Sequence, residues 1–457
     1  MEMLALSAQV CIEPQCGAWF ELNERLYTCS LCGGLLDIAR TGDSLDNAQN
    51  LPRIWEARRT SSKLRDRSGV WRFRELLPFA EDPPIVTLEE GNTPLYDAQR
   101  CASYCGVDSL KLKHQGCNPT GSFKDTGMTA AVTQALILGA RTVVCASTGN
   151  TAASLAAYAA RARLRCAILI PKGQVSHAKV AQSLDYGARV LEIEGNFDDC
   201  LRLVRGLGEE ESVYLVNSIN PFRIEGQKTV AVELMEQLHW QVPDHVVVPG
   251  GNLGNSTALG KGFSELLDLG LIGRLPRLSV IQAANAAPFA RIFENVDLTE
   301  FAAGLIPNDL LQPILHPQTL ASAIKIGVPI SWKKALRAVI QSGGQVITVT
   351  ENEIADAKAI IGRDGIGCEP ASATTVAGIK RLVATGHINP SASVVAVLTG
   401  HVLKDTDYAI QYHRDNLFIP NRDGGVNKET RRINATYSNA PRRVKADRKT
   451  ILAELDR

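Results

Sequence analysis

The sequence predicts an α/β protein with mostly parallel sheets, preceded by a small cysteine-rich segment. From about residue 90, short apolar runs rich in β-branched residues, such as RTVVCAS (141–147) and HVVVPGG (245–251), alternate with helical segments such as NTAASLAAYAARA (150–162). This alternation is typical of strand-helix-strand units around buried parallel sheets. The 457 residues are 45% hydrophobic and 21% charged, which is enough chain to bury a large core in two or three structural units.

The net charge and the N-terminal sequence argue against a nucleic-acid-binding, membrane or secreted protein. A formal net charge of +1 gives no field that would attract nucleic acid or an anionic membrane. The first ten residues carry Glu2, lack basic residues and are too short and interrupted for a signal peptide, and no run of about 18 apolar residues predicts a membrane span. The eleven cysteines, an odd number without a secretion signal, favour reduced thiols. We therefore expect a cytoplasmic protein with no nucleic-acid or membrane partner.

Four cysteines make the first forty residues distinct. CIEPQC holds Cys11 and Cys16, CSLC holds Cys29 and Cys32, and two glycines follow. Thiolates suit tetrahedral zinc because the ion is borderline-soft, and so small a segment needs a staple to fold. The sequence therefore predicts a zinc-ribbon-like segment over residues 1–40. The alternative is a small β-hairpin with four reduced cysteines and no metal.

The rest of the chain divides by composition. Residues 41–85 predict a polar, partly helical connector whose aromatic stretch GVWRFRELLPF (69–79) docks it onto the following region. The regular strand and helix pattern ends near residue 405. Residues 406–457 are polar and contain basic runs such as APRRVKADRK (440–449), so we expect an appended, solvated tail.

Small polar residues follow three of the expected strands. PGGNLGN (249–255) contains Gly250, Gly251 and Gly254, which let backbone amides approach a phosphate closely. STGNT (147–151) opens a helix, and LTG (398–400) places Thr399 at a strand end. Ligands gather at such ends because free N–H groups and the helix dipole attract anions. Each stretch alone also fits a tight turn or an ordinary helix cap, and the glycine loop lacks Walker A or Rossmann spacing.

Lys124 is a candidate reactive group for this ligand site. NPTGSFKD (118–125) places it where a polar turn gives way to an apolar helix. A lysine there faces the positive end of the helix dipole and costs stability. The location and partial burial lower the pKa of the amine and free it as a nucleophile, which a Schiff-base lysine requires. With a phosphate cradle, an asparagine and a strand-end hydroxyl, this lysine predicts a pyridoxal phosphate site.

The same stretches carry a family resemblance. NPTGSFKD, STGNT, PGGNLGN and LTGH, in this order, resemble the fold-type II pyridoxal-phosphate enzymes, which include tryptophan synthase β. Within them, EGNTPL (90–95), VNSINPFRIEGQKT (216–229) and DGIGCEPASATT (364–375) resemble the threonine synthases, as does YTCSLCGGLLDI (27–38) around the second cysteine pair. The resemblance implies a two-domain tryptophan synthase β-like architecture for residues 86–405, with a smaller mobile domain, roughly 125–235, inserted in the larger one.

The resemblance also implies roles for the site residues. Lys124 would hold the cofactor covalently and later move protons, with Phe123 near the ring. Asn150 would hydrogen-bond the ring hydroxyl, and Thr399 would meet the ring nitrogen and, as a neutral hydroxyl, leave it less protonated. The loop of Gly250, Gly251, Asn252, Leu253, Gly254 and Asn255 would bind the cofactor phosphate. The phosphate of the substrate would bind Asn217, Ser218 and Arg223, with Ser147, Thr148 and Thr151 nearby.

The reaction implied is conversion of O-phospho-L-homoserine and water to L-threonine and phosphate by a homodimer. Two alternatives stay open. Another lyase of the family, such as a threonine or serine dehydratase or a cysteate synthase, would lack the phosphate-binding stretch NSINPFR (217–223). A non-catalytic regulatory or nucleic-acid-binding protein would use the cysteine segment, but residues 11–40 carry four acidic and two basic side chains, the wrong sign for a phosphate backbone.

Overall fold

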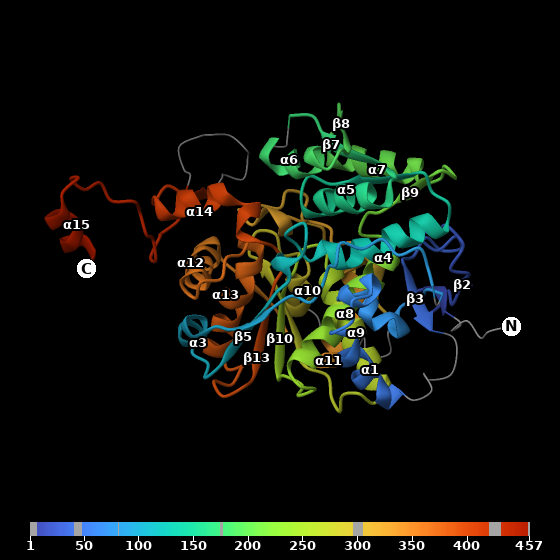
Figure 1. The fold of residues 1–457 in the computed structure, drawn as a ribbon, viewed down its shortest axis with the longest axis horizontal. Coiled ribbons are helices and arrows are strands. Elements are labelled where there is room, and N and C mark those ends of the chain that lie inside the picture. Colours follow the sequence, from blue (N-terminus) through green and yellow to red (C-terminus); the bar gives the residue numbers. More distant parts are fainter. Residues whose placement is uncertain are drawn as a thin grey trace.

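The computed structural model describes residues 7–40, 48–80, 82–173, 177–295, 305–419 and 431–455. Two sheets with helices packed on them form the body of the molecule, and a small antiparallel sheet lies at one side (Figure 1). The chain has the fold-type II architecture expected from the sequence. No helix of the described ranges is long and apolar enough to cross a membrane.

The larger sheet has six strands in the order β12-β11-β10-β13-β5-β4. They are β4 (Leu95–Asp97), β5 (Leu110–His114), β10 (His245–Pro249), β11 (Arg277–Ala283), β12 (Val346–Val349) and β13 (Val394–Leu398). All neighbours pair in parallel except the edge strand β4, which is antiparallel to β5. Every residue of β10 and β13 is buried, which explains their continuous apolar sequences, since helices cover both faces.

Alternate residues of β10 face two different cores. Val246 and Val248 pack with α8 (Phe222–Gln237), α9 (Gly254–Asp268) and α11 (Trp332–Ser342). Val247 packs on the other side with α3 (Gln99–Cys105), α12 (Glu351–Arg363) and α13 (Pro370–Ala384). Helix α10 (Ala290–Asn295) contacts β12 of this sheet. The two-residue period of a strand therefore fixes which helix layer each valine meets.

The smaller sheet has four parallel strands in the order β8-β7-β6-β9. They are β6 (Thr142–Ala146), β7 (Arg165–Pro171), β8 (Arg189–Ile193) and β9 (Val213–Leu215), and they occur between β5 and β10 of the larger sheet. Helices α4 (Lys124–Ile137) and α5 (Asn150–Ala162) contribute to one core of this sheet and α7 (Phe197–Leu207) to the other, while α6 (His177–Asp185) lies beside α5. Helix α8, within the range expected for the smaller domain, buries Val230 to Met235 in the core of the larger sheet.

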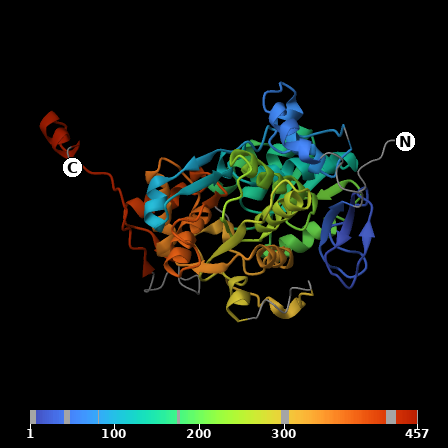
Figure 2. The same ribbon diagram turned by 90° about the horizontal axis from the view of Figure 1, so that it is seen from below.

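The connector and the C-terminal segment both pack on the body. In the connector, α1 (Leu51–Arg58), α2 (Leu64–Arg67) and the 3-10 turns η1 (Ala48–Asn50) and η2 (Trp71–Leu76) bring Trp55 and Phe73 into the core of the larger sheet. After residue 405, α14 (Thr406–His413) buries Tyr408 and Tyr412 against α12, near the short strands β14 (Phe418–Ile419) and β15 (Arg431–Arg432). The expected solvated tail therefore describes only residues 438–455, none of which is buried and which end in α15 (Arg448–Leu455), the helix that stands apart in both views (Figures 1 and 2).

The cysteine segment contacts a helix of the larger sheet and a strand of the smaller one. Its strands β1 (Ser7–Cys11), β2 (Trp19–Phe20) and β3 (Leu36–Arg40) form the antiparallel sheet seen at the edge of the molecule in Figure 2. Toward the larger sheet, Lys333 of α11 forms an ion pair with Glu13 at 2.7 Å. Toward the smaller sheet, the Tyr27 hydroxyl accepts the Leu215 N–H of β9 at 2.7 Å. The cysteine segment therefore contacts the parts of the chain around both the larger and the smaller sheet.

Candidate active site

Lys124 is the first residue of α4, and the turn before it is tied to the end of β13. The Phe123 N–H donates to the Thr399 carbonyl at 2.9 Å, and Ser122 pairs with Gly400. The next residue, Asp125, is buried and accepts the backbone N–H of Thr120 at 2.7 Å. The turn therefore brings the lysine to the carboxyl edge of the larger sheet, where parallel α/β proteins bind ligands.

The surroundings of Lys124 favour its neutral amine. Its Nζ lies 3.7 Å from the centroid of the Phe123 ring. Burial lowers the pKa of Lys124 well below its usual range, and the positive charge of Arg223 lowers it further, while the Glu369 carboxylate acts in the opposite direction. In its neutral form the amine is a nucleophile and a proton acceptor.

The loop between β10 and α9 is shaped for close backbone approach. A Cβ on Gly250 would lie 2.7 Å from Val280 Cγ1 and 2.8 Å from Gln282 Cγ, so only glycine fits against β11. Leu253 has a φ of 64°, a left-handed conformation that costs a non-glycine residue about 1–3 kcal/mol and is concentrated at ligand sites. A Cβ on Gly254 would find no atom nearer than 3.8 Å. The loop is thus crowded behind Gly250 and open at Gly254.

Polar groups at the start of α9 lack partners. Within the described residues, no protein acceptor binds the backbone N–H groups of residues 251 to 255. Both polar atoms of the Asn255 side chain and the Ser256 hydroxyl are buried without a hydrogen bond. Buried polar groups are normally paired, and helix N-termini bind phosphate. These groups fit the phosphate of pyridoxal phosphate.

Glu369 links the two sheets at this edge. Its carboxylate accepts hydrogen bonds from Asn150 Nδ2 of α5 at 3.0 Å and from Thr399 Oγ1 at 3.1 Å. Burial raises the pKa of Glu369, and these two donors limit the rise. The motif DGIGCEPASATT (364–375) contains Glu369, but the sequence assigned this residue no role. Its signal was a lone acidic residue directly before the helix-opening Pro370 in an apolar stretch.

Arg223, near the start of α8, is a buried charge without a counterion. Its side chain is 3% exposed, Nη1 donates weakly to the Val216 carbonyl at 3.4 Å, and Nε has no partner. No carboxylate of the described chain lies within ion-pair distance of it. Burial lowers its pKa to about 10. A buried guanidinium in this state is suited to an anionic ligand.

The remaining substrate candidates surround the end of β6. Asn217 Oδ1 accepts the Ala146 N–H at 3.1 Å and its Nδ2 donates to the Ala146 carbonyl at 3.0 Å, which leaves one Nδ2 proton. Ser147 Oγ accepts the Gly149 N–H at 3.3 Å. The hydroxyls of Thr148, Thr151 and Ser218 are partly exposed and bond to no other described residue. These side chains are therefore free for a ligand.

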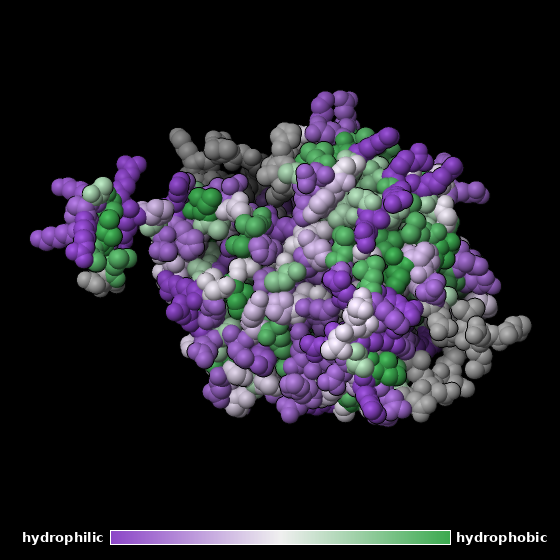
Figure 3. Space-filling view, in the orientation of Figure 1, coloured by the Kyte–Doolittle hydropathy of each residue, from purple (hydrophilic) through white to green (hydrophobic). Residues whose placement is uncertain are grey.

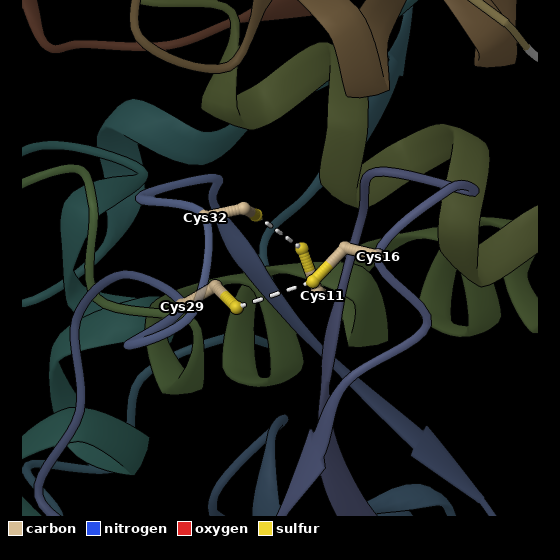
Figure 4. Close-up of side chains that lie close together, drawn as sticks. All are labelled: Cys11, Cys16, Cys29 and Cys32. Atoms are coloured by element: carbon tan, nitrogen blue, oxygen red, sulfur yellow. Dashed lines mark hydrogen bonds between the residues drawn. The ribbon is translucent and has the colours of Figure 1, made fainter.

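The four cysteines form a second candidate site. Figure 4 shows their sulfurs pointing toward one another, with Cys11 Sγ 3.4 Å from Cys32 Sγ and Cys16 Sγ 3.6 Å from Cys29 Sγ. All four sulfurs lie within 4.8 Å of one another. Zinc with four Zn–S bonds of about 2.3 Å requires sulfurs about 3.8 Å apart. The sulfur cluster therefore has the size of a tetrahedral zinc site.

The fold and the candidate site define a pyridoxal-phosphate-dependent enzyme. The site consists of Lys124, the glycine loop after β10 and the Thr399 hydroxyl. The family model described as pyridoxal-phosphate dependent enzyme matches residues 86–400. Solved structures with a similar fold include a pyridoxal 5'-phosphate-dependent aspartate racemase (TM-score 0.54, 23% identity, 68% of this chain and 90% of that one). They also include the processed threonine deaminase isoform 2 of Solanum lycopersicum (TM-score 0.58, 17% identity, 88% of this chain and 95% of that one).

Relatives with a higher sequence identity to this chain are threonine synthases. The threonine synthase of Methanocaldococcus jannaschii is 45% identical over 413 residues, which are 90% of this chain and 96% of that protein. The threonine synthase of Methanosarcina acetivorans is 46% identical over 402 residues, 88% of this chain and 93% of that protein. The chain belongs to the threonine synthases, within the pyridoxal-phosphate-dependent enzymes.

Proposed function

We propose that this protein converts O-phospho-L-homoserine and water to L-threonine and phosphate. The observation that carries the proposal is the buried, uncompensated charge of Arg223, which lowers the pKa of Lys124 and so acts within the same site. A site for a phosphorylated substrate needs such a group beside the nucleophilic lysine. The similarity to threonine synthases supports the same substrate.

The cofactor would be held by three parts of the site. Lys124 would bind it covalently, beside the Phe123 ring, and Asn150 and Thr399 would contact its ring hydroxyl and ring nitrogen. The free N–H groups of the loop Gly250, Gly251, Asn252, Leu253, Gly254 and Asn255 would bind its phosphate. Pyridoxal phosphate, when bound, supplies an electron sink for negative charge that develops on the substrate carbons.

The substrate phosphate would bind the opposite group of residues. Arg223 offers Nε and the remaining guanidinium N–H groups, and Ser218 and the free Nδ2 proton of Asn217 add neutral donors. Ser147, Thr148 and Thr151 lie on the adjoining loop and would complete the contacts. Arg223 would also stabilise the charge of the phosphate as it leaves the γ-carbon.

Lys124 would be the proton-transfer group. Its Nζ would accept the α-proton of the substrate and return protons later in the reaction, and the lowering of its pKa by burial favours the neutral amine that this needs. Water would be added at the β-carbon.

The experiment that tests this function compares two substrates. Purified enzyme with pyridoxal phosphate should release inorganic phosphate and form threonine from O-phospho-L-homoserine, and should deaminate serine or threonine only slowly. A family dehydratase would show the reverse preference, because its substrates carry no phosphate. If the protein binds the cofactor but neither releases phosphate nor deaminates serine or threonine, the result would favour the non-catalytic alternative over an enzyme.

The proposal extends to features outside the active site. One zinc ion in the cysteine cluster fits the sulfur distances. A homodimer is supported by apolar residues that gather where Figure 1 shows α4 and α5 (Figure 3), and sedimentation measures its mass directly. The smaller sheet and its helices would form the mobile domain, in a cytoplasmic enzyme without nucleic-acid or membrane partners.

A further inference from the structure

A cavity of about 340 Å³ lies between α12 and the C-terminal segment that follows residue 405. Figure 1 shows α14 of this segment beside α12. Tyr412 holds the two together, because its hydroxyl donates to Asp356 Oδ1 of α12 at 2.7 Å and accepts the Tyr437 N–H at 3.1 Å. None of the residues assigned to the active site lines this cavity. Its volume is that of a site for a small organic molecule.

The lining of the cavity is positively charged. Lys358 and Arg363 of α12 and His413 of α14 line it, and none of the described lining residues is acidic. No carboxylate of the described chain forms an ion pair with Lys358 or Arg363. Burial and then the charges of Lys358 and Arg363 lower the pKa of His413. Burial raises the pKa of Cys368, also in the lining, to about 12, and the Lys358 charge opposes this rise. The Lys358 charge therefore acts across the cavity on both neighbours.

The polar groups of the lining have hydrogen-bond donors to spare. His413 Nδ1 accepts the Asn439 N–H at 3.0 Å, so a neutral ring carries its proton on Nε2, which bonds to no other described residue. The Tyr408 hydroxyl is buried without a hydrogen bond. Arg363 Nη2 donates weakly to the Tyr437 carbonyl at 3.4 Å, which leaves other guanidinium N–H groups available. Buried polar groups are normally paired, so these groups fit a ligand with acceptor atoms.

Aromatic rings form much of the remaining wall. Tyr408, Tyr412 and Tyr437 all line the cavity, and the Arg363 guanidinium lies over the Tyr437 ring, 5.0 Å from its centroid. Aromatic side chains bind flat rings by stacking or edge contacts and bury a large apolar area. The cavity therefore combines cations with aromatic surfaces.

We propose that this cavity is a binding site for a phosphate monoester that carries an aromatic ring. A phosphate monoester has about two negative charges at neutral pH, which match the permanent charges of Lys358 and Arg363. Arginine binds phosphate oxygens in bidentate fashion, and His413 Nε2 adds a third donor. The ring of the ligand packs among the tyrosines. A carboxylate would leave one of the two cations without a counter-charge.

Two variants remove different parts of the site. The double variant Lys358→Gln/Arg363→Gln removes both charges. Gly362→Leu, on the same helix, keeps both charges and fills part of the cavity that Gly362 lines. A Cβ at Gly362 meets no atom within 4 Å, and leucine favours a helix more than glycine does, so this variant should fold. The control Lys172→Gln removes an exposed charge after β7, where Lys172 pairs with Glu194 at 2.9 Å.

The experiment is calorimetric titration of the holoenzyme with phenyl phosphate, with inorganic phosphate and phenol titrated in parallel. We expect phenyl phosphate to bind the wild type, Lys172→Gln and Arg223→Met, which lacks the proposed anchor for the substrate phosphate. Inorganic phosphate lacks the ring and phenol lacks the charge, so both should bind the cavity at least about tenfold more weakly. Phenyl phosphate should also bind the double variant and Gly362→Leu at least about tenfold more weakly.

Several results overturn the inference. One is a wild type that does not bind phenyl phosphate. Another is binding that both cavity variants retain and Arg223→Met abolishes, which places the ligand in the active site. Equally tight binding of phenol would refute the role of the cations, and equally tight binding of inorganic phosphate would refute the role of the rings. If the double variant does not fold, Gly362→Leu decides, and unchanged binding there contradicts the proposed site.

Discussion

Replacing Arg223 by methionine should stabilise the protein when no phosphate is present and abolish its use of a phosphorylated substrate. Methionine keeps most of the volume of the side chain and removes a charge that has no partner in the described structure. An arginine in water has a pKa of about 12.5. Burial lowers that of Arg223 to about 10.

The pKa gives the size of the effect. Each pKa unit is worth about 1.4 kcal/mol, so holding the charge of Arg223 in the folded state costs about 3 kcal/mol. Both pKa values lie well above neutral pH, so the guanidinium is charged in the folded and the unfolded chain and the whole cost applies at pH 7. Arg223→Met should recover up to about 3 kcal/mol of the free energy of unfolding, less any packing loss.

Arg72 provides the matched control. It is 1% exposed and forms an ion pair with Glu236 at 2.7 Å. Arg72→Met leaves that carboxylate with only the more distant and exposed Arg59, at 3.6 Å, and should destabilise the protein by about 3 kcal/mol. The two variants thus make the same chemical change with opposite expected signs.

The assay is denaturant unfolding of the holoenzyme with and without inorganic phosphate, followed by kinetics. Phosphate should stabilise the wild type and not Arg223→Met, whose kcat/KM for O-phosphohomoserine should fall at least about a hundredfold, since a charge-assisted bidentate contact worth about 3 kcal/mol or more is lost. Slow deamination of serine should change little. If Arg223→Met destabilises the protein as Arg72→Met does, or loses both activities together, Arg223 is not an unpaired phosphate anchor.

Three other outcomes test the remaining features. Lys124→Ala should stay folded by circular dichroism but lose both the visible absorbance of the cofactor and turnover, because the covalent amine is gone, and near-normal activity would contradict the site. Cys29→Ser should lose about one zinc per chain by elemental analysis while keeping the cofactor, and a wild type without metal but with an ordered segment would rule out the zinc. Burial alone would raise the pKa of Asp37, but Lys261 and Lys334 outweigh it and hold this pKa well below its usual range. Asp37→Asn should therefore lower the free energy of unfolding at neutral pH by about 3 kcal/mol, and the difference from wild type should shrink as the pH falls below about 4; a difference that does not depend on pH would refute the pairing.

The position of the candidate site in the fold was predictable, because parallel sheets bring the ends of their strands together. The carboxyl ends of their strands share one edge, so the residues after β6, β10 and β13 had to lie near one another within each sheet. The glycines after β10 and the lysine that opens α4 are local features, and local sequence determines backbone freedom and helix starts. The family resemblance added the order of these stretches along the chain.

Other features depended on packing that local sequence does not encode. The sequence from Tyr408 to Tyr412 reads as a polar tail, yet both tyrosines are buried because α12 offers them an apolar surface. Helix α8 follows the smaller sheet in the chain, but its apolar residues are buried beside α9, in the core of the larger sheet. Which sheet a helix joins depends on the surfaces available after folding, not on its position in the chain.

The sequence by itself determined the class of fold, the lysine, the glycine loop and the four cysteines, because each depends on neighbours a few residues away. Only the tertiary structure decided the electrostatics of the site. Asn150 and Glu369 are 219 positions apart yet hydrogen-bonded, and Arg223 is buried with no carboxylate of the described chain beside it. Charge pairing and burial depend on distances in space, which the folded chain sets by bringing remote segments together. The partners of Glu369 and the state of Arg223 therefore could not be obtained from the order of residues.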